Sequence, residues 1–232
     1  MGAEPLVPLA DGLWVAGRPL PILVGDVGTR MTVVRLESGD LWLHSPVALD
    51  SATRAALDRL GEVRWIVGPS KVHHLFLGEY AAAYPAAELC AAPGLPAKRE
   101  DLRFQHVLDG SWVPPWAAEL PHLLFEGAPL MNEVVFFHRA TRTLLLTDLC
   151  FHVQPGVTGR ARLFHWLVGA APGRFGPHRL IRAGIRDRAA ARRSLERILE
   201  WDFDRVVVSH GAVLERGGRA RLPECFAFLG RA

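Results

Sequence analysis

Short runs of β-branched and aromatic residues dominate the first 45 positions and predict β-strands. They occupy 12–16, 31–36 and 40–44, and Gly, Pro and Asp residues separate them. The sequence SGD at 38–40 is a turn signal between two of the runs. We therefore expect these segments to form antiparallel strands.

In the next segment, DSATRAALDRL at 50–60, the spacing of hydrophobic residues changes from that of a strand to that of a helix. The segment begins with an Asp/Ser cap, and we predict a helix here. A strand is expected in VRWIVG at 63–68. A short helix then runs to the break at Pro85, and a short strand is centred near Leu89. This alternation is typical of an α/β (α+β) chain.

The second half of the chain repeats the pattern more strongly. EVVFFH and RTLLLTD, joined by RAT, predict a β-hairpin over 133–148, after a weaker strand signal at 122–127. A helix is expected over 187–202, where Leu and Ile face inward and charges face outward. DRVVVSHGAV at 204–213 predicts a buried strand.

An irregular segment at about 153–186, with scattered Gly and Pro, is interpreted as an insertion or cover. The surrounding stretch from Arg139 to Arg205 is basic, with 13 arginines against 6 acidic residues. It is interpreted as a solvated helix face, with anion attraction as the alternative. Aromatic residues do not interleave with the arginines, so nucleic acid is not an expected partner. The apolar piece around Trp166 is expected to be a lid or a packing surface.

Composition limits the class of protein. The chain has 232 residues, of which 50% are hydrophobic and 22% charged, with a net charge of +3, so we expect one α/β domain over 1–232. It contains no signal-like start and no apolar run of ~20 residues, which favours a soluble, cytoplasmic protein without a membrane span. Cys90, Cys150 and Cys225 are far apart and odd in number, and are expected to be reduced core residues. Nothing in the sequence sets the oligomeric state.

Polar residues stand just after the apolar strands. His44 follows LWL, Asp148 follows LLLT, His210 follows VVVS, and His73 and His74 follow WIVGPSKV. Strand ends are where sites are assembled from residues distant in sequence, and imidazole and carboxylate groups bind zinc, iron or manganese. A single histidine at a strand end is more often a hydrogen-bonded turn residue, and Asp148 could cap the following turn, so the hypothesis of a site depends on their convergence.

The order of these segments resembles the metallo-β-lactamase superfamily, and more closely a family of uncharacterised proteins within it. The resemblance rests on DGLWVAG, RMTVVRLESGDLWLHSP, LGEVRWIVGPSKVHHLFLGEY, VVFFHRATRTLLLTDL and FDRVVVSHG. It covers nearly the whole chain, and 153–186 is its weakest part. It implies an αββα metallo-β-lactamase-like sandwich, with a metal site at one edge between the two sheets.

The superfamily's first metal-binding motif, HxHxDH, is degenerate here. With Gly78 aligned to the glycine that follows the motif, His73 keeps its place, while Lys71, Leu75 and Phe76 replace the other ligands. Pro129 stands where a later histidine ligand is usual, whereas Asp148 and His210 match the superfamily's late ligands. The resemblance therefore implies a reduced ligand set.

We predict a metal-dependent hydrolase with a non-standard, mononuclear site that acts on a small and possibly anionic molecule. Zinc is favoured over iron or manganese, because three protein ligands and one water complete a catalytic zinc shell. The candidate metal ligands are His73, His74, Asp148 and His210, with His44 as a further ligand or a residue that supports one. Asp148 would also orient the nucleophile, and Lys71 would bind an oxyanion or an anionic group.

The alternative hypothesis is a catalytically inactive relative that binds no metal. In that case Lys71, His73 or His74, and His210 would form a cationic pocket for a small anion or a protein partner. Lys71 also argues against an ion at the first motif position, because like charges repel. Enzymatic activity is therefore an open question at this point, and metal content separates the two hypotheses.

Overall fold

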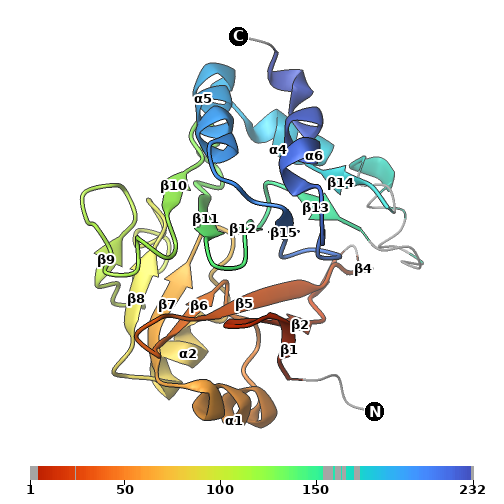
Figure 1. Ribbon diagram of the computed structural model, residues 1–232. Helices are drawn as coiled ribbons and strands as arrows, with labels where there is room; N and C mark the ends of the chain where they lie inside the picture. The colour runs from red at the N-terminus through yellow and green to blue at the C-terminus, as the bar shows by residue number, and fades with distance from the viewer. Residues whose placement is uncertain are drawn as a thin grey trace.

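The structure is a computed structural model that describes residues 5–23, 25–153, 159, 163, 166–169 and 173–230. Two β-sheets pack face to face, and helices cover the outer side of each sheet (Figure 1). α1 and α2 lie against the larger sheet, and α4, α5 and α6 lie on the side of the smaller one. The predicted αββα sandwich is confirmed.

The larger sheet has seven strands in the order β1-β2-β5-β6-β7-β8-β9. Its first half is antiparallel, and β6, β7, β8 and β9 run parallel to one another. The strands are β1 (Val7–Ala10), β2 (Leu13–Arg18), β5 (Thr29–Arg35), β6 (Leu41–His44), β7 (Val63–Gly68), β8 (Glu88–Ala91) and β9 (His106–Val107). The parallel strands β6 and β7 both point their C-terminal ends toward the same edge of the sheet.

The smaller sheet has four strands in the order β10-β11-β12-β15, and β12 and β15 are its parallel pair. Two short antiparallel pairs lie outside the sheets. The strands are β10 (His122–Leu124), β11 (Val134–His138), β12 (Thr143–Leu145) and β15 (Arg205–Val207), with the pairs β3 (Pro21–Ile22) and β4 (Gly25–Asp26), and β13 (Phe151–His152) and β14 (Phe175–Gly176).

The helices begin where the sequence supplies capping side chains. The Asp50 carboxylate accepts a hydrogen bond from Thr53 N at 2.7 Å, and Asp187 accepts one from Ala190 N at 2.9 Å. The helices are α1 (Ser51–Leu60), α2 (Leu77–Ala83), α4 (Arg179–Gly184), α5 (Arg188–Leu199) and α6 (Gly218–Cys225), followed by a 3-10 turn at Ala227–Leu229. None of the described helices is long and apolar enough to cross a membrane.

Strand alternation distributes the apolar residues over three cores, one between each pair of layers. Val33 faces α1 and α2, whereas the next residue, Val34, faces the other sheet. On β6, Leu41 and Leu43 face the helices and Trp42 lies between the sheets. Successive side chains of a strand point to opposite faces. Because both faces of β6 are covered, by the helices on one side and the second sheet on the other, the consecutive residues Leu41, Trp42 and Leu43 are all apolar.

Most predicted elements are confirmed, including the hairpin, in which Phe136 pairs with Leu145. The last strand is shorter than expected: β15 ends at Val207 because the chain turns back and Val206 pairs with Leu214. Of the predicted cover at 153–186, β14 and α4 are described, whereas part of the apolar piece around Trp166 lies outside the described residues. The three cysteines are free; Cys90 and Cys150 are buried, and Cys225 is half-buried.

His44 lies in the core between the sheets, among aromatic rings. Its imidazole stacks on Trp42 at 5.7 Å between ring centroids and meets Phe136 edge-on at 5.4 Å. Within the described part of the chain, its buried Nε2 atom has no hydrogen-bond partner. Burial, reinforced by the electrostatic interaction with His73, lowers the pKa of His44 to about 3, so the folded protein holds this ring neutral.

This burial predicts an acid sensitivity that replacing His44 removes. Below pH ~6.5 the unfolded chain takes up a proton that folded His44 cannot accept, so the free energy of unfolding falls by ~1.4 kcal/mol per pH unit. We measure the free energy of unfolding by urea denaturation at pH 7.5 and at pH 5.0. Between these values we expect it to fall by about 2 kcal/mol more in the wild type than in His44→Phe, a variant that keeps the aromatic packing. Equal losses in the two proteins would contradict the prediction.

Candidate metal centre

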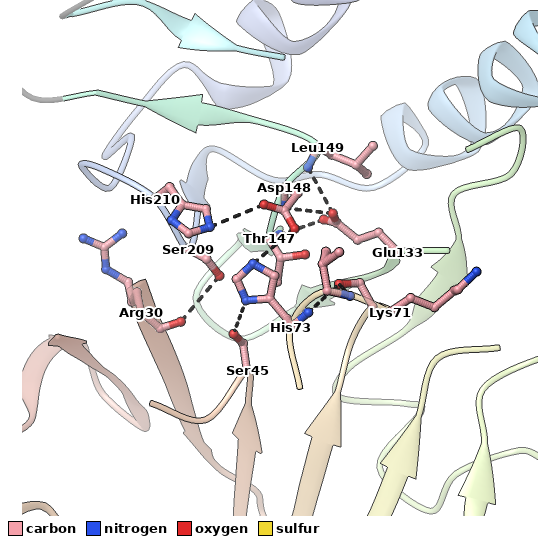
Figure 2. A network of polar contacts seen from close by, with 12 residues as sticks. Arg30, Ser45, Lys71, His73, Glu133, Thr147, Asp148, Leu149, Ser209 and His210 are labelled. Atoms are coloured by element: carbon pink, nitrogen blue, oxygen red, sulfur yellow. Dashed lines mark hydrogen bonds and ion pairs between the residues drawn. The ribbon is translucent and has the colours of Figure 1, made fainter. Parts of the chain in front are cut away.

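Three side chains from separate loops meet at the edge between the sheets: His73, Asp148 and His210 (Figure 2). His73 Nε2 lies 3.2 Å from Asp148 Oδ2, and His210 Nε2 lies 3.3 Å from Asp148 Oδ1. One donor atom of each residue lies within 4.8 Å of the other two. The three side chains are no more than 12% exposed, so they converge in a mostly buried site.

The spacing of these donor atoms fits a small divalent ion. Zn–N and Zn–O bonds of ~2.0–2.2 Å with tetrahedral angles separate neighbouring donors by roughly 3.3–3.5 Å. Each histidine nitrogen lies at about this distance from one Asp148 oxygen, His73 from Oδ2 and His210 from Oδ1. Asp148 Oδ2 is buried and, although it faces His73, has no hydrogen-bond donor among the described residues. A buried carboxylate oxygen is costly unless a proton donor or a cation faces it, and a metal ion between Asp148 and the histidines would meet this need. The described residues contain no second group of this kind.

A serine on each side holds His73 in place. The loop after β7 turns on Ser70, whose Oγ accepts hydrogen bonds from the backbone N–H groups of Val72 and His73 at 3.3 and 3.1 Å. Ser45, directly after β6, places its Oγ 2.7 Å from His73 Nδ1. Ser45 has a φ of 55°, a left-handed conformation that is unusual for a residue other than glycine. These contacts direct His73 Nε2 toward Asp148.

Glu133 fixes the loop that carries Asp148. Its buried carboxylate accepts hydrogen bonds from the backbone N–H groups of Thr147, Asp148 and Leu149 at 2.7, 2.8 and 3.0 Å (Figure 2). Burial and the neighbouring Asp148 charge raise the pKa of Glu133 to about 7. The backbone N–H donors oppose this pKa shift. Their hydrogen bonds to the carboxylate also fix the backbone conformation of residues 147–149.

His210 is fixed by the larger sheet. Its Nδ1 lies 2.7 Å from the carbonyl oxygen of Gly28, and because a carbonyl only accepts, Nδ1 is the donor and Nε2 faces Asp148. The Arg30 guanidinium donates to the carbonyl oxygens of Val208, at 2.5 Å, and Gly211, at 2.6 Å, on either side of His210. A tautomer fixed in this way presents the other ring nitrogen to a metal.

Gly211 lets the loop after His210 pass directly beside β13. Its φ is +99°, and a Cβ atom there would collide with the carbonyl oxygen of His152, so glycine is required immediately after His210. The two segments pair backbone to backbone: His152 N donates to His210 O at 3.1 Å, and Ala212 N donates to His152 O at 2.7 Å. The loop that carries His210 is thus held by β13 on one side and by the larger sheet on the other.

The charges of the three residues support one another. Burial opposes the ionised form of Asp148, but the electrostatic interaction with His73 and the contacts with both histidines hold the pKa of Asp148 well below its usual range. Burial likewise opposes the charged form of His210, but the contact with Asp148 outweighs it and raises the pKa of His210. Asp148 is therefore the anion that either protons on the histidines or a bound cation must balance.

A cavity of about 240 Å³ opens beside the three residues. Its lining residues are Leu20, Ile22, Val27, Thr29, Pro46, Val72, His73, His74, Leu75, Phe76, Asp148, Phe151, His178 and His210. Phe151 stacks on the ring of His210 at 5.0 Å between centroids, with an interplanar angle of 8°. The wall next to the candidate ligands is thus largely apolar.

The structure brings together three of the four candidate ligands from the sequence and places the other candidates elsewhere. His74 lines the cavity, but its Nδ1 lies 3.3 Å from the Arg99 guanidinium instead of facing Asp148. Lys71 does not line the cavity, and its Nζ donates to the carbonyl oxygen of Pro129 at 3.0 Å. His44 lies in the aromatic core, and the next residue, Ser45, contacts His73.

Sequence reasoning missed four residues that complete the site: Ser45, Arg30, Glu133 and His178. His178 caps α4 by accepting from Ile181 N at 3.4 Å, and it lines the cavity. Glu133 gave the clearest signal, because it is a carboxylate at the start of a strand whose other residues are apolar or aromatic. A charge that becomes buried needs partners, and these are found across the hairpin.

Residues 10–163 match the model of a protein family described as "Domain of unknown function (DUF4336)". The chain belongs to this family. The matched region includes His73, Glu133 and Asp148, whereas His210 lies beyond it. A comparison with curated proteins finds no match to this DUF4336 chain.

Solved structures similar to this DUF4336 chain are metallo-β-lactamases. The enzyme from Hirschia baltica has a TM-score of 0.63 at 14% identity, covering 97% of this chain and 96% of that one. The enzyme from Pontibacter korlensis has a TM-score of 0.65 at 13% identity, covering 97% of both chains. FIM-1 from Pseudomonas aeruginosa, in its mono-zinc form, has a TM-score of 0.61 at 15% identity, covering 97% and 93%. The predicted metallo-β-lactamase fold is confirmed.

Replacing Glu133 tests its control over the Asp148 loop. In Glu133→Gln one carboxylate oxygen becomes an NH₂ group that opposes a backbone N–H donor, so at least one of the three hydrogen bonds is lost inside the core. We expect the free energy of unfolding to fall by about 2–3 kcal/mol, measured by urea denaturation. Glu126→Gln, on an exposed residue nearby, is the matched control and should change stability by less than about 0.5 kcal/mol. Equal stability of the two variants would contradict the assigned role.

Proposed function

We propose that this chain is a metal-dependent hydrolase that uses one divalent ion held by His73, Asp148 and His210. The observation that carries the proposal is the convergence of three donor residues, each with one donor atom within 4.8 Å of the other two. His73 Nε2 lies 3.2 Å from Asp148 Oδ2, and His210 Nε2 lies 3.3 Å from Asp148 Oδ1. The metallo-β-lactamase fold supports it, and one similar structure, FIM-1 from Pseudomonas aeruginosa, is described in a mono-zinc form.

Two imidazoles and one carboxylate favour zinc, with iron or manganese as alternatives. An ion bound there would supply Lewis acidity that polarises a substrate oxygen and activates water near neutral pH. Three protein donors leave a position open for water or substrate, which is the arrangement of catalytic zinc sites. A second ion is not part of the proposal, because the described residues offer only this one group of donors.

The remaining residues of the site orient the ligands and shape the cavity. Ser45 and the Gly28 carbonyl fix the two imidazoles through their Nδ1 atoms. Asp148 presents two oxygens to the site, so one can bind the ion while the other accepts a hydrogen bond from an entering water molecule. Phe151, stacked on His210, excludes water from that face of the ring. Such support of metal ligands tunes their affinity.

An inactive relative with a cationic pocket has less support. Lys71, which would supply the fixed charge, donates to the Pro129 carbonyl and does not line the cavity. The two histidines that line it beside Asp148 face a carboxylate. Among the described lining residues, an anion would meet Asp148 before it met any permanent positive charge.

The adjacent histidines provide a matched test of metal binding. Protein purified without a metal column and without chelator should contain close to one zinc, iron or manganese per chain by inductively coupled plasma mass spectrometry. His73→Ala, Asp148→Ala and His210→Ala should lose most of this metal, whereas His74→Ala should retain it, because His74 faces Arg99 instead of Asp148.

A wild-type protein that contains no metal, and takes none up on dialysis against these ions, would overturn the proposal. Loss of metal in His74→Ala with retention in His73→Ala would place the ligand on the neighbouring residue instead. Circular dichroism of each variant separates loss of a ligand from loss of the fold.

Ser45 supports the site without being a candidate ligand, so its replacement should weaken binding instead of abolishing it. Removing the hydroxyl that lies 2.7 Å from His73 Nδ1 frees the imidazole to rotate and to change tautomer. We expect Ser45→Ala to bind zinc about 10–100-fold more weakly, measured by competition with a chromogenic chelator. Ser38→Ala, on an exposed turn, is the control, and an equal affinity in the two variants would contradict the assigned role.

A further inference from the structure

Apolar side chains and histidines make up most of the lining of the cavity beside the candidate metal centre. Among the described residues, the lining includes no lysine or arginine, and Asp148 is its one carboxylate. The other polar lining residues are Thr29 and four histidines. A negatively charged substrate would therefore approach Asp148 without a permanent cation to bind it, apart from the ion itself.

Basic side chains near the cavity are engaged elsewhere. Arg30 donates to two backbone carbonyl oxygens beside His210. Arg18 contacts Asp50 and Thr53, and Arg99 forms an ion pair with Asp101 at 2.7 Å. These guanidinium groups serve the protein's own structure, and recruiting one for a substrate anion would break contacts that it already makes.

The entrance of the cavity carries exposed apolar side chains from two segments. Ile22 in β3 is 47% exposed, and Val72 and Leu75 in the loop of His73 are 43% and 59% exposed. All three also line the cavity. Large apolar side chains that are both solvent-exposed and grouped around a cavity indicate a surface that a ligand covers.

We propose that the site accepts an uncharged carboxylic ester with an apolar acyl chain, an inference that rests on the hydrolase function proposed above. The acyl chain would lie against Ile22, Val72 and Leu75, and the ester carbonyl would face the three candidate ligands. This assignment replaces the expectation of an anionic substrate, because the apolar lining and the lack of a lysine or arginine among the described lining residues both favour a neutral molecule.

The reaction consumes one water molecule and needs no other reactant. The water oxygen bonds to the acyl carbon, the bond from that carbon to the ester oxygen breaks, and the alcohol leaves with one proton. The second water proton passes to solvent, and a carboxylate remains. Asp148 repels this anionic product from the site that bound its neutral precursor.

A series of esters tests the inference through turnover. For the p-nitrophenyl esters of acetate, butyrate and hexanoate, kcat/KM should rise by about two- to fourfold for each added methylene group. The upper value corresponds to full burial of that group and the lower value to partial burial. The mono-p-nitrophenyl ester of adipate has a chain as long as that of hexanoate but ends in a carboxylate, and we expect it to be about tenfold poorer or worse. His210→Ala supplies the background rate for subtraction.

Binding to the metal-free protein supplies a readout that does not depend on catalysis. Hexanamide, a neutral and unreactive analogue, should bind about tenfold or more tightly than acetamide in calorimetric titrations. Leu75→Asp should weaken hexanamide binding about five- to tenfold, because it replaces an apolar contact with a charge. Val113→Asp, on a side chain that is 80% exposed and outside the cavity lining, should leave binding unchanged.

The two measurements separate the inference from the function on which it rests. Hexanamide binding without ester turnover would support the apolar site and overturn the hydrolase. Turnover that is independent of chain length, or faster for the adipate ester, would overturn the inference and leave the hydrolase standing. If neither hexanamide binding nor ester turnover is observed, both the inference about the substrate and the proposed hydrolase function are overturned.

Discussion

The position of Asp148 depends on a buried carboxylate that accepts three consecutive backbone N–H groups. Glu133 immediately precedes β11 and reaches across the hairpin to residues 147–149. Burying a carboxylate in the core carries a large cost in hydration, which shows in its raised pKa, and the three donors offset that cost. Because the donors belong to the backbone on both sides of Asp148, the loop has little freedom to move its side chain.

The loops that carry two of the candidate ligands each contact the side of the opposite sheet. His210 follows a strand of the smaller sheet, yet its ring contacts the carbonyl oxygen of Gly28, next to β5 of the larger sheet. Arg30 in β5 donates to two backbone carbonyl oxygens close to His210. The loop of His73 follows β7 of the larger sheet, and Lys71 N donates to Met131 O at 2.8 Å in the connection before β11. The site and the packing of the two sheets are therefore parts of one structure, and separating the sheets would disperse the ligands.

The sequence predicted what local patterns determine. Strands, capped helices and the convergence of His73, Asp148 and His210 followed from periodicity, from polar residues at strand ends and from the family resemblance. The choice between His73 and His74 did not follow, because the loop after β7 is irregular and its direction is set by the Ser70 hydroxyl. Ser45 and Arg30 act through contacts with residues far away in the sequence, which no local pattern encodes.

The reduced ligand set and the apolar cavity have a common origin in the same short segment. The resemblance places Leu75 and Phe76 where the superfamily's first motif carries ligands, and both residues line the cavity here. An apolar side chain at these two positions offers no donor to a second ion and adds apolar surface beside the candidate metal centre. Since a second cation would otherwise attract anionic groups, both effects favour the neutral substrate proposed above. Under the proposed function, the degenerate motif therefore changes what the cavity recognises while three candidate ligands are kept.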